Sequence, residues 1–223
     1  MTTPTFTSEV TTTFTRQSDA EAIVGTLSNP SKMPGHGYSI PAKRCITGQK
    51  LRFIKHSVCS KCYALKGRYP TSVVQQAMEK RFNSLRHPKW VDAISFLISC
   101  TSDAYFRWHD SGDLQSVRHL DNIVRVADRL PHVQFWLPTR EYNIVFRYIQ
   151  DGGHIPDNLT VRLSSHMIDG PAPESLARRL GVQVSGVTTT PEFTCPSRQY
   201  GNTCGPCRAC WDRSIFNITY KQH

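Results

Sequence analysis

The chain has 223 residues, a formal net charge of +10, and 39% hydrophobic residues. This length suits one sizeable domain or two small ones, and the composition supports a packed core. No apolar run approaches the roughly 20 residues that span a bilayer, and no charged segment precedes an apolar one at the N-terminus. We therefore expect a cytoplasmic protein with no membrane partner, whose positive charge attracts nucleic acid or other anions.

The two ends of the chain differ in composition from its middle. Residues 1–28 begin with a Thr-rich stretch that has few charges and no helical period, so we expect an N-terminal arm there. Residues 29–41 contain three prolines and two glycines, which is typical of an irregular loop. We expect residues 29–223 to form a single α/β metal-binding domain, closed by a cysteine-rich array at residues 194–211.

The middle of the chain alternates between helical and strand-like periods. Helices are predicted over residues 72–85, 88–99, 114–130, 141–150 and 173–180, and strands over 51–54, 104–108, 133–137, 159–163 and 182–187. Alternation with short connections indicates repeated βαβ units and a parallel sheet. Because such crossovers are right-handed, we expect an α/β fold of parallel βα repeats that forms a partial or full TIM-like barrel.

Polar, ionisable residues follow the predicted strands. In parallel α/β folds, function collects at the carboxyl ends of the strands, which share one edge. The candidate catalytic residues at this edge are Arg107, His109, Asp110, Arg140, Glu141 and His166. Asp110 is expected to face Arg140 and orient a polar substrate, whereas Asp113 is expected to cap the helix that follows it. A core position remains an open alternative for His109.

Seven of the eight cysteines fall into two sets. The upstream set is Cys45, Cys59 and Cys62, spaced C-x13-C-x2-C, and the tail set is Cys195, Cys204, Cys207 and Cys210, spaced C-x8-C-x2-C-x2-C. Thiols two residues apart converge on one ion or cluster from a tight turn. In a reducing compartment this pattern favours metal over disulfides. The eighth cysteine, Cys100, ends an apolar run and is expected in the core.

The number of thiols in each set bears on the metal. Thiolates suit both zinc and iron–sulfur clusters. The four tail cysteines are enough for a structural zinc site or for a four-iron, four-sulfur (4Fe–4S) cluster. The three upstream cysteines leave a zinc site one ligand short but suit a 4Fe–4S cluster with one open iron. We therefore expect one or two 4Fe–4S clusters, with zinc as the alternative and a single shared four-cysteine site still open.

Four segments carry a resemblance to a known family. They are CSKCYALKGRY (residues 59–69), RWHDSGDL (107–114), FWLPTRE (135–141) and CGPCRACW (204–211). These motifs resemble the phage-encoded gene product 88 family over most of the chain from residue 29. The resemblance implies the host cell cytoplasm as the location and no particular activity.

The segment CSKCYA (residues 59–64) is also similar to the cluster loop of radical S-adenosylmethionine enzymes, which use a partial βα barrel and sometimes carry additional cysteine clusters. This similarity implies a cluster bound by Cys45, Cys59 and Cys62, with S-adenosylmethionine as a further cofactor. The first spacing departs from the usual C-x3-C, because thirteen residues separate Cys45 from Cys59.

Two hypotheses about function follow. The first is a phage-encoded iron–sulfur enzyme, radical-type or redox, which acts at the C-terminal edge of a βα barrel. Its substrate is an unidentified small molecule or nucleic acid, and it requires an electron donor. The second is a non-catalytic zinc or iron–sulfur protein that binds nucleic acid or a host factor through a basic surface.

Overall fold

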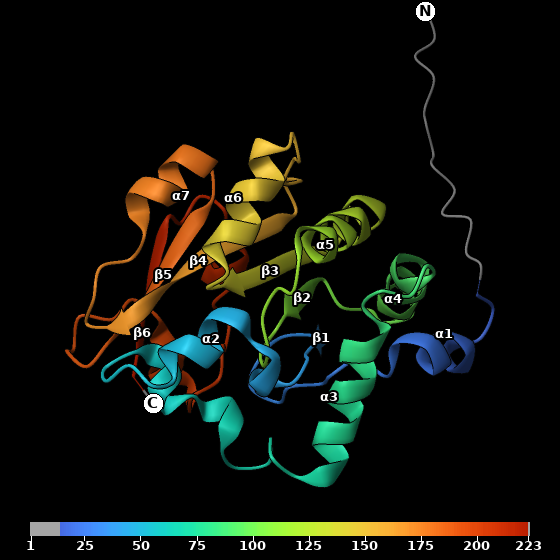
Figure 1. Ribbon diagram of the computed structural model, residues 1–223, viewed down its shortest axis with the longest axis horizontal. Helices are drawn as coiled ribbons and strands as arrows, with labels where there is room; N and C mark the ends of the chain where they lie inside the picture. Colours follow the sequence, from blue (N-terminus) through green and yellow to red (C-terminus); the bar gives the residue numbers. More distant parts are fainter. Residues whose placement is uncertain (1–13, 223) are drawn as a thin grey trace, which may run out of the picture.

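A six-stranded parallel sheet forms the centre of the computed structural model, which describes residues 14–222 (Figure 1). The strands are β1 (Gly37–Tyr38), β2 (Tyr105–Trp108), β3 (Gln134–Thr139), β4 (Leu159–Ile168), β5 (Gln183–Thr188) and β6 (Asn217–Lys221). They lie in chain order, and every neighbouring pair is parallel. The expected α/β fold with a parallel sheet is confirmed. Closure into a barrel is not shown, because no pairing within residues 14–222 joins β1 to β6.

Helices alternate with the strands. They are α1 (Gln17–Val24), α2 (Ile46–Leu51), α3 (Ser72–Ser84), α4 (Trp90–Ser99), α5 (Val117–Arg129), α6 (Tyr142–Gln150) and α7 (Glu174–Leu180). Short 3-10 helices are η1 (Ala42–Arg44), η2 (Val58–Lys61), η3 (Tyr63–Leu65), η4 (Pro196–Tyr200) and η5 (Ala209–Trp211). Helices α4 to α7 lie on one side of the sheet (Figure 1).

The two faces of the sheet differ because successive strand residues point to opposite sides. Phe106 and Phe135 are fully buried in the main core, which they share with apolar residues of α1 and α4 to α7. Their neighbours Tyr105 and Trp136 point the other way and pack against Trp211 of η5, with ring centroids 5.6 and 5.3 Å from it. The helices therefore cover one face, and the cysteine-rich tail covers the other.

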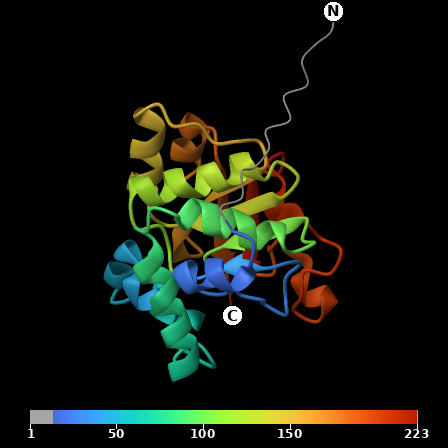
Figure 2. The same ribbon diagram turned by 90° about the vertical axis from the view of Figure 1, so that its right-hand side faces the viewer.

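Hydrogen bonds fasten the tail to its face of the sheet. Trp211 donates from Nε1 to the main-chain oxygen of Phe106 at 2.9 Å, and Thr160 donates from Oγ1 to the oxygen of Trp211 at 2.7 Å. After this crossing the chain returns to form β6, which pairs with β5 at the end of the sheet. Figure 2 separates the tail, in red, from the cyan segment that carries the upstream cysteines.

Three elements differ from the sequence-based expectations. Helix α1 lies within the stretch assigned to an arm, yet its Ala20 and Val24 are fully buried, so the compact fold starts before residue 29. Most of the Thr-rich stretch, residues 1–13, lies outside the described residues. Residues 51–54 are not a strand but the end of α2 and a turn. The irregular loop at 29–41 contains the short strand β1, which its prolines and glycines concealed.

Cys100 is not in the core, and its expected burial is wrong. It is exposed, and it follows the last residue of α4 as the helix cap. The apolar run before it is buried through Ile98, but the helix turns Ser99 and Cys100 toward solvent. A run of apolar residues predicts burial only along the face that packs, and the last turn of α4 has left that face.

Candidate functional site

The upstream cysteines meet at the carboxyl edge of the sheet, although two separate segments supply them. Cys45 immediately precedes α2, Cys59 lies in η2, and Cys62 directly follows η2. The Sγ atoms of Cys45 and Cys59 lie 3.6 and 3.7 Å from the point where a Cβ on Gly48 would stand. Burial raises the pKa of the Cys45 thiol, and the nearby Asp113, Cys62 and Cys59 raise it further. The three thiols are thus close neighbours.

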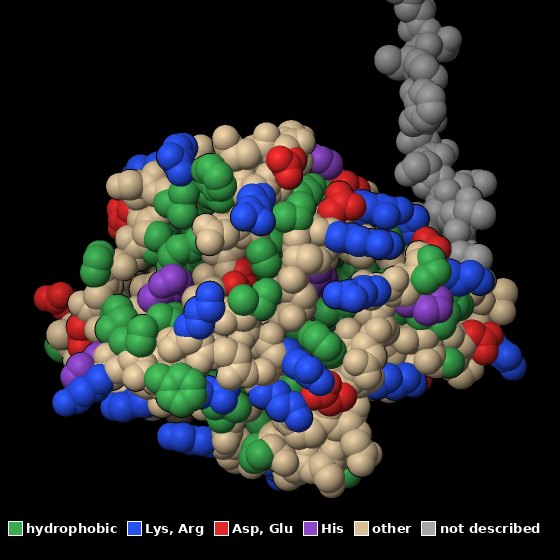
Figure 3. All heavy atoms as spheres, in the orientation of Figure 1, with side chains coloured by type: hydrophobic (Ala, Val, Ile, Leu, Met, Phe, Trp, Pro, Cys, Tyr) green, Lys and Arg blue, Asp and Glu red, His purple; other side chains and the backbone are tan. Residues whose placement is uncertain are grey.

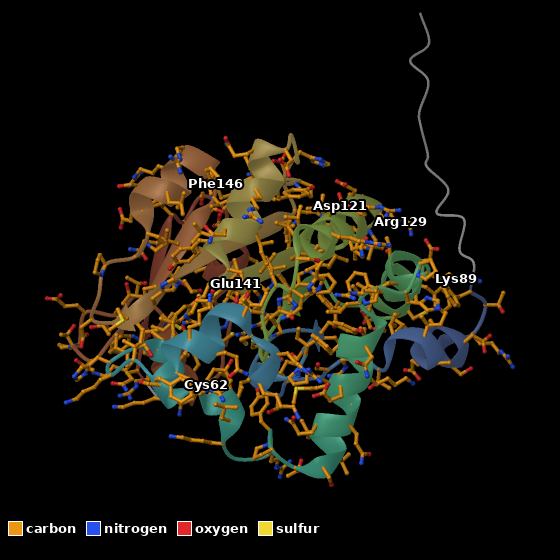
Figure 4. The ribbon with its side chains drawn as sticks, in the orientation of Figure 1. Cys62, Lys89, Asp121, Arg129, Glu141 and Phe146 are labelled. Atoms are coloured by element: carbon orange, nitrogen blue, oxygen red, sulfur yellow. The ribbon has the colours of Figure 1, made fainter. Side chains whose placement is uncertain are left out.

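Glu141 holds the cysteine-bearing segment against the strand ends. It lies directly before α6, is 5% exposed, and accepts hydrogen bonds from the main-chain N and the Oγ1 of Thr47, both at 2.7 Å. Thr47 is two residues from Cys45. Figure 4 labels Glu141 and Cys62, which lie on either side of α2 in that view. Glu141 therefore positions the first turn of α2, and with it the Cys45 thiol.

Asp113 joins two strand ends and does not cap the next helix. Its carboxylate accepts from Thr139 Oγ1 at 2.6 Å, from the Arg140 main-chain N at 2.9 Å, and from the Leu114 main-chain N at 2.8 Å. Ser116 caps α5 instead, since its Oγ accepts from a main-chain N in the first turn at 3.1 Å. The expected capping role of Asp113 is therefore wrong. Burial raises the pKa of Asp113 to about 6, against those three hydrogen bonds, which lower it.

Asp110 faces the cysteine-bearing segment, but not Arg140. Its Oδ2 accepts a hydrogen bond from the Tyr69 hydroxyl at 2.9 Å, its main-chain oxygen accepts one from the Tyr63 hydroxyl, and its Oδ1 is buried without a partner. Within residues 14–222 no ion pair joins Asp110 to Arg140. Arg140 instead donates from Nε to the oxygen of Ser165 at 3.1 Å. The expected charged pair is not formed. Asp110 instead accepts hydrogen bonds from two tyrosines of the cysteine-bearing segment.

The two candidate histidines lie in different surroundings. His166 is half-buried, stacks on Tyr142 with ring centroids 4.4 Å apart, and lies with Nε2 3.3 Å from the Arg140 main-chain oxygen. His109 is 3% exposed and packs edge-on against His119 with centroids 5.2 Å apart. Neither ring nitrogen of His109 has a hydrogen-bond partner, and burial lowers its pKa well below the ordinary value. His109 is thus a neutral core residue here, whereas His166 belongs to the carboxyl edge.

Arg107 lies on the tail-facing side of β2. Its guanidinium stands 4.3 Å above the Trp136 ring and donates to the Met33 sulfur at 3.0 Å, while its Nε is buried without a partner. Burial opposes the charge, but nearby Tyr63 and Asp110, together with Tyr220 and Cys210, keep the pKa of Arg107 above its ordinary value. The Arg107 side chain thus interacts electrostatically with groups near both cysteine sets.

The tail cysteines gather against the other face of the sheet. Cys210 is 9% exposed, and Cys195 and Cys204 pack on the same small apolar cluster. The Cys210 sulfur lies 3.2 Å from the Tyr220 hydroxyl of β6. Burial raises the pKa of the Cys210 thiol to about 11, while the nearby Arg162 lowers it.

Arg162, which sequence reasoning did not single out, clamps the tail. It is fully buried in β4 and donates from Nε to the oxygen of Cys210 at 3.1 Å. It also donates to the oxygens of Ala209 and Asp212 at 2.8 Å and of Ile215 at 2.9 Å. No carboxylate within residues 14–222 forms an ion pair with it. A cation at an interior strand position was the signal available in the sequence.

Neither thiol set is arranged around a single point. Among residues 14–222, no group of three or more His, Cys, Asp or Glu side chains is placed to hold a metal ion. The described part of the chain also contains no helix with the length and apolarity needed to cross a bilayer.

Comparison with protein-family models identifies one relationship. The model described as gene product 88 matches residues 9–213, which is most of the chain, and the protein belongs to this phage family. The searches of curated proteins and of solved structures found no match. The family resemblance expected from the motifs is therefore confirmed, whereas the similarity to radical S-adenosylmethionine enzymes finds no support in these comparisons.

Proposed function

We propose that this phage protein is an iron–sulfur protein whose upstream cysteines hold a 4Fe–4S cluster at the carboxyl edge of the sheet. The observation that carries the proposal is the meeting of Cys45 and Cys59 beside Gly48, from two separate segments, with Cys62 close enough to raise the pKa of Cys45 beyond the effect of burial. A Cβ at Gly48 would stand 2.8 Å from that of Cys45, so any other residue here would displace the Cys45 side chain.

The number of donors favours a cluster over a single ion. Zinc needs all of its sulfurs about 2.3 Å from one ion. In a 4Fe–4S cluster each thiolate binds a different iron, so the sulfurs stand farther apart. Three thiols leave a tetrahedral zinc site one ligand short, whereas each of them can bind a different iron of a cluster. Three cysteines also leave one iron open, which is what a cluster that acts on a substrate requires.

The surrounding residues support chemistry at this edge. Strands in chain order with helices on one face are the arrangement of a partial TIM-like barrel, in which substrates bind at the carboxyl ends of the strands. The bound cluster would supply single electrons, either to a substrate or to a cofactor such as S-adenosylmethionine. Arg140, which lowers the pKa of the Cys59 thiol against the larger effect of burial, would orient an anionic group. The free Oδ1 of Asp110 would accept a proton or a hydrogen bond.

The tail is proposed as a second thiolate centre with a structural role, holding either a cluster or zinc. Among the described residues, the buried cation of Arg162 has carbonyl partners but no carboxylate, so a negative charge nearby would stabilise it. A metal bound by four thiolates carries net negative charge, and Cys210 stands beside this guanidinium. Arg107 lies near the same thiol and would add to this compensation.

Anaerobic purification followed by iron, sulfide and zinc analysis tests the proposal. We expect brown protein whose iron and sulfide content falls in Cys59→Ser, with the tail metal retained. Cys100→Ser is the matched control, because that thiol is exposed and separate from both sets. Electron paramagnetic resonance of the reduced protein, with and without S-adenosylmethionine, then reports whether the open iron binds that cofactor. A colourless protein containing only zinc, or equal iron in Cys59→Ser and Cys100→Ser, would refute the upstream cluster.

A further inference from the structure

The segment that carries the upstream cysteines also concentrates positive charge. Residues 22–78 contain no Asp or Glu. Six cations occupy α2, η2, η3 and their connections, namely Lys50, Arg52, Lys55, Lys61, Lys66 and Arg68. None of the six forms an ion pair within residues 14–222, whereas the neighbouring Lys43 and Arg44 both pair with Glu79. Figure 3 shows Lys and Arg side chains gathered along this lower rim of the molecule.

Exposed apolar side chains occupy the same segment. The large hydrophobic residues exposed there are Ile46, Phe53, Ile54, Tyr63, Leu65 and Val73. Phe53 is the most exposed of them, at 84%, and Tyr63 is 45% exposed. We call residues 46–73 the basic rim. A surface that combines unpaired cations with exposed aromatic rings is typical of a binding surface. Exposed apolar side chains are unfavourable in water, so a group of them on a surface indicates an interaction site.

We propose that the basic rim binds single-stranded nucleic acid. Its cations match a phosphate backbone, and its exposed rings offer stacking platforms that every base can use. Duplex recognition places a longer helix or ribbon in a groove, and α2 has only six residues. Membrane surfaces take up a continuous apolar helix face. Here the apolar side chains come from three elements and alternate with cations, which favours the nucleic acid strand.

A hollow beside the rim offers room for a base. It has a volume of about 290 Å³ and is lined by Ala42, Lys43, Ala64, Leu65, Pro70 and Gln75. Next to it, Tyr63 and Tyr69 meet edge to face with ring centroids 5.7 Å apart, and both donate to Asp110. A strand on the rim would therefore reach the carboxyl edge, although binding itself does not depend on the proposed cluster.

Fluorescence anisotropy with a labelled oligothymidylate, measured across a series of salt concentrations, tests this inference. Lys50→Gln, Lys55→Gln and Lys61→Gln together should lower affinity at least about tenfold and reduce the salt slope by about 2, since each phosphate contact on a single strand contributes about 0.7. The matched control replaces three exposed cations on the helical side, Lys89, Arg118 and Arg125, by Gln and should leave affinity and slope unchanged. Figure 4 labels Lys89 far from Cys62.

Phe53→Ala separates stacking from charge. It should weaken binding about fivefold or more with no change in the salt slope, because it removes a base platform and no cation. This side chain is so exposed that the variant loses little packing, and its iron content and Tm should match the parent protein. Equal losses of affinity in the rim variant and in the control variant would overturn the proposal. So would tighter binding of duplex than of single strand, or binding to phosphatidylglycerol vesicles in place of the oligonucleotide.

Discussion

The two cysteine regions use the same side chain in opposite surroundings. The tail thiols lie against a sheet face, where Trp211 and the clamp of Arg162 cover them and Cys210 is almost fully buried. The upstream thiols lie at an open edge, half-buried in short helices, next to a rim rich in exposed side chains. Both sets contain half-buried thiols, and only Cys210 is buried, so the difference lies in their supports. The sheet face behind the tail set ties it to stability, whereas the edge around the upstream set suits it to binding and reaction.

Their electrostatic surroundings differ as well. The pKa of Cys45, already raised by burial, is raised further by the nearby carboxylates of Asp113 and Glu141. In the tail, burial again raises the pKa of Cys204, but Arg107 and Arg208 act in the opposite direction. The upstream edge is not uniformly negative, because Arg140 lowers the pKa of the Cys59 thiol against the larger effect of burial, and the cations of the basic rim lie next to that edge.

Removing one thiol from each set should give the largest contrast. Cys204→Ser is expected to lower the free energy of unfolding by roughly 5 kcal/mol or more, because metal binding at thiolates contributes directly to folding. Cys59→Ser should cost about 1 kcal/mol, since the metal proposed there would lie at an open edge and contribute less to packing. Urea unfolding of anaerobically purified protein measures both. Equal destabilisation would show that the two regions do not divide structure from function.

The Arg162 clamp should be the next largest contribution. Arg162→Met keeps the length of the side chain but leaves several buried carbonyl oxygens without a donor, and we expect a loss of about 3 kcal/mol or more. Protease digestion should then cut within the tail before the rest of the chain. Arg213→Met is the control, because this half-buried arginine pairs with the fully exposed Asp157 and should cost less than about 1 kcal/mol. A clamp that matters no more than this surface pair would contradict the account of the tail.

Asp113 gives the upstream edge a distinctive pH dependence. Its folded pKa of about 6 lies above the ordinary value of 3.8, so between these values the folded state binds more protons than the unfolded state. Its contribution to stability is therefore present at about pH 4 and lost as pH rises through about 6, by up to about 3 kcal/mol. As pH rises through this range, the parent protein should lose this stability and Asp113→Asn should not, so the variant becomes more stable relative to the parent by the same amount. Urea midpoints across that range measure it, and a constant difference would show that Asp113 does not titrate there.

The smallest effect should come from Cys100. Cys100→Ser replaces an exposed helix cap residue, so stability should change by less than about 0.5 kcal/mol and metal content should not change. Thermal unfolding and metal analysis check this expectation. Loss of iron or zinc in this variant would mean that an eighth thiol takes part and that the division into two sets is incomplete.

The sequence predicted most of the central fold because its signals were local. Apolar periodicity located α3 to α7 and β2 to β5 to within a few residues. It missed β1, which has two residues among prolines, and β6, which follows the tail with no helix before it. Arg162 was also missed, because an arginine within a strand looks like a solvent-facing residue until the tail is known to cover that face.

The position of several candidate residues at one edge was predicted for a similar reason, whereas their catalytic roles stay predictions. Parallel strands must present their carboxyl ends together, so Asp110, Arg140 and His166 could be assigned to one edge, and the structure places all three there. Their partners depend on long-range packing that no local pattern reports. Tyr69 donates a hydrogen bond to the Asp110 carboxylate, and Thr47 donates one to the Glu141 carboxylate. Both donors lie within or beside the cysteine-bearing segment, but the sequence does not show that they meet these carboxylates.

The position of β6 after the tail has a consequence for the protein during synthesis. This strand can pair with β5 only after the preceding residues have crossed the sheet face and packed around Trp211. Until then β5 presents an unpaired edge, and exposed strand edges recruit other chains. If the tail binds metal as proposed, a shortage of metal while the chain is being made should appear first as aggregated protein. Metal added after purification would then reach a chain that has already associated incorrectly. Expression in iron-supplemented, oxygen-limited cells is accordingly expected to raise the yield of dispersed protein, and not only its cluster content.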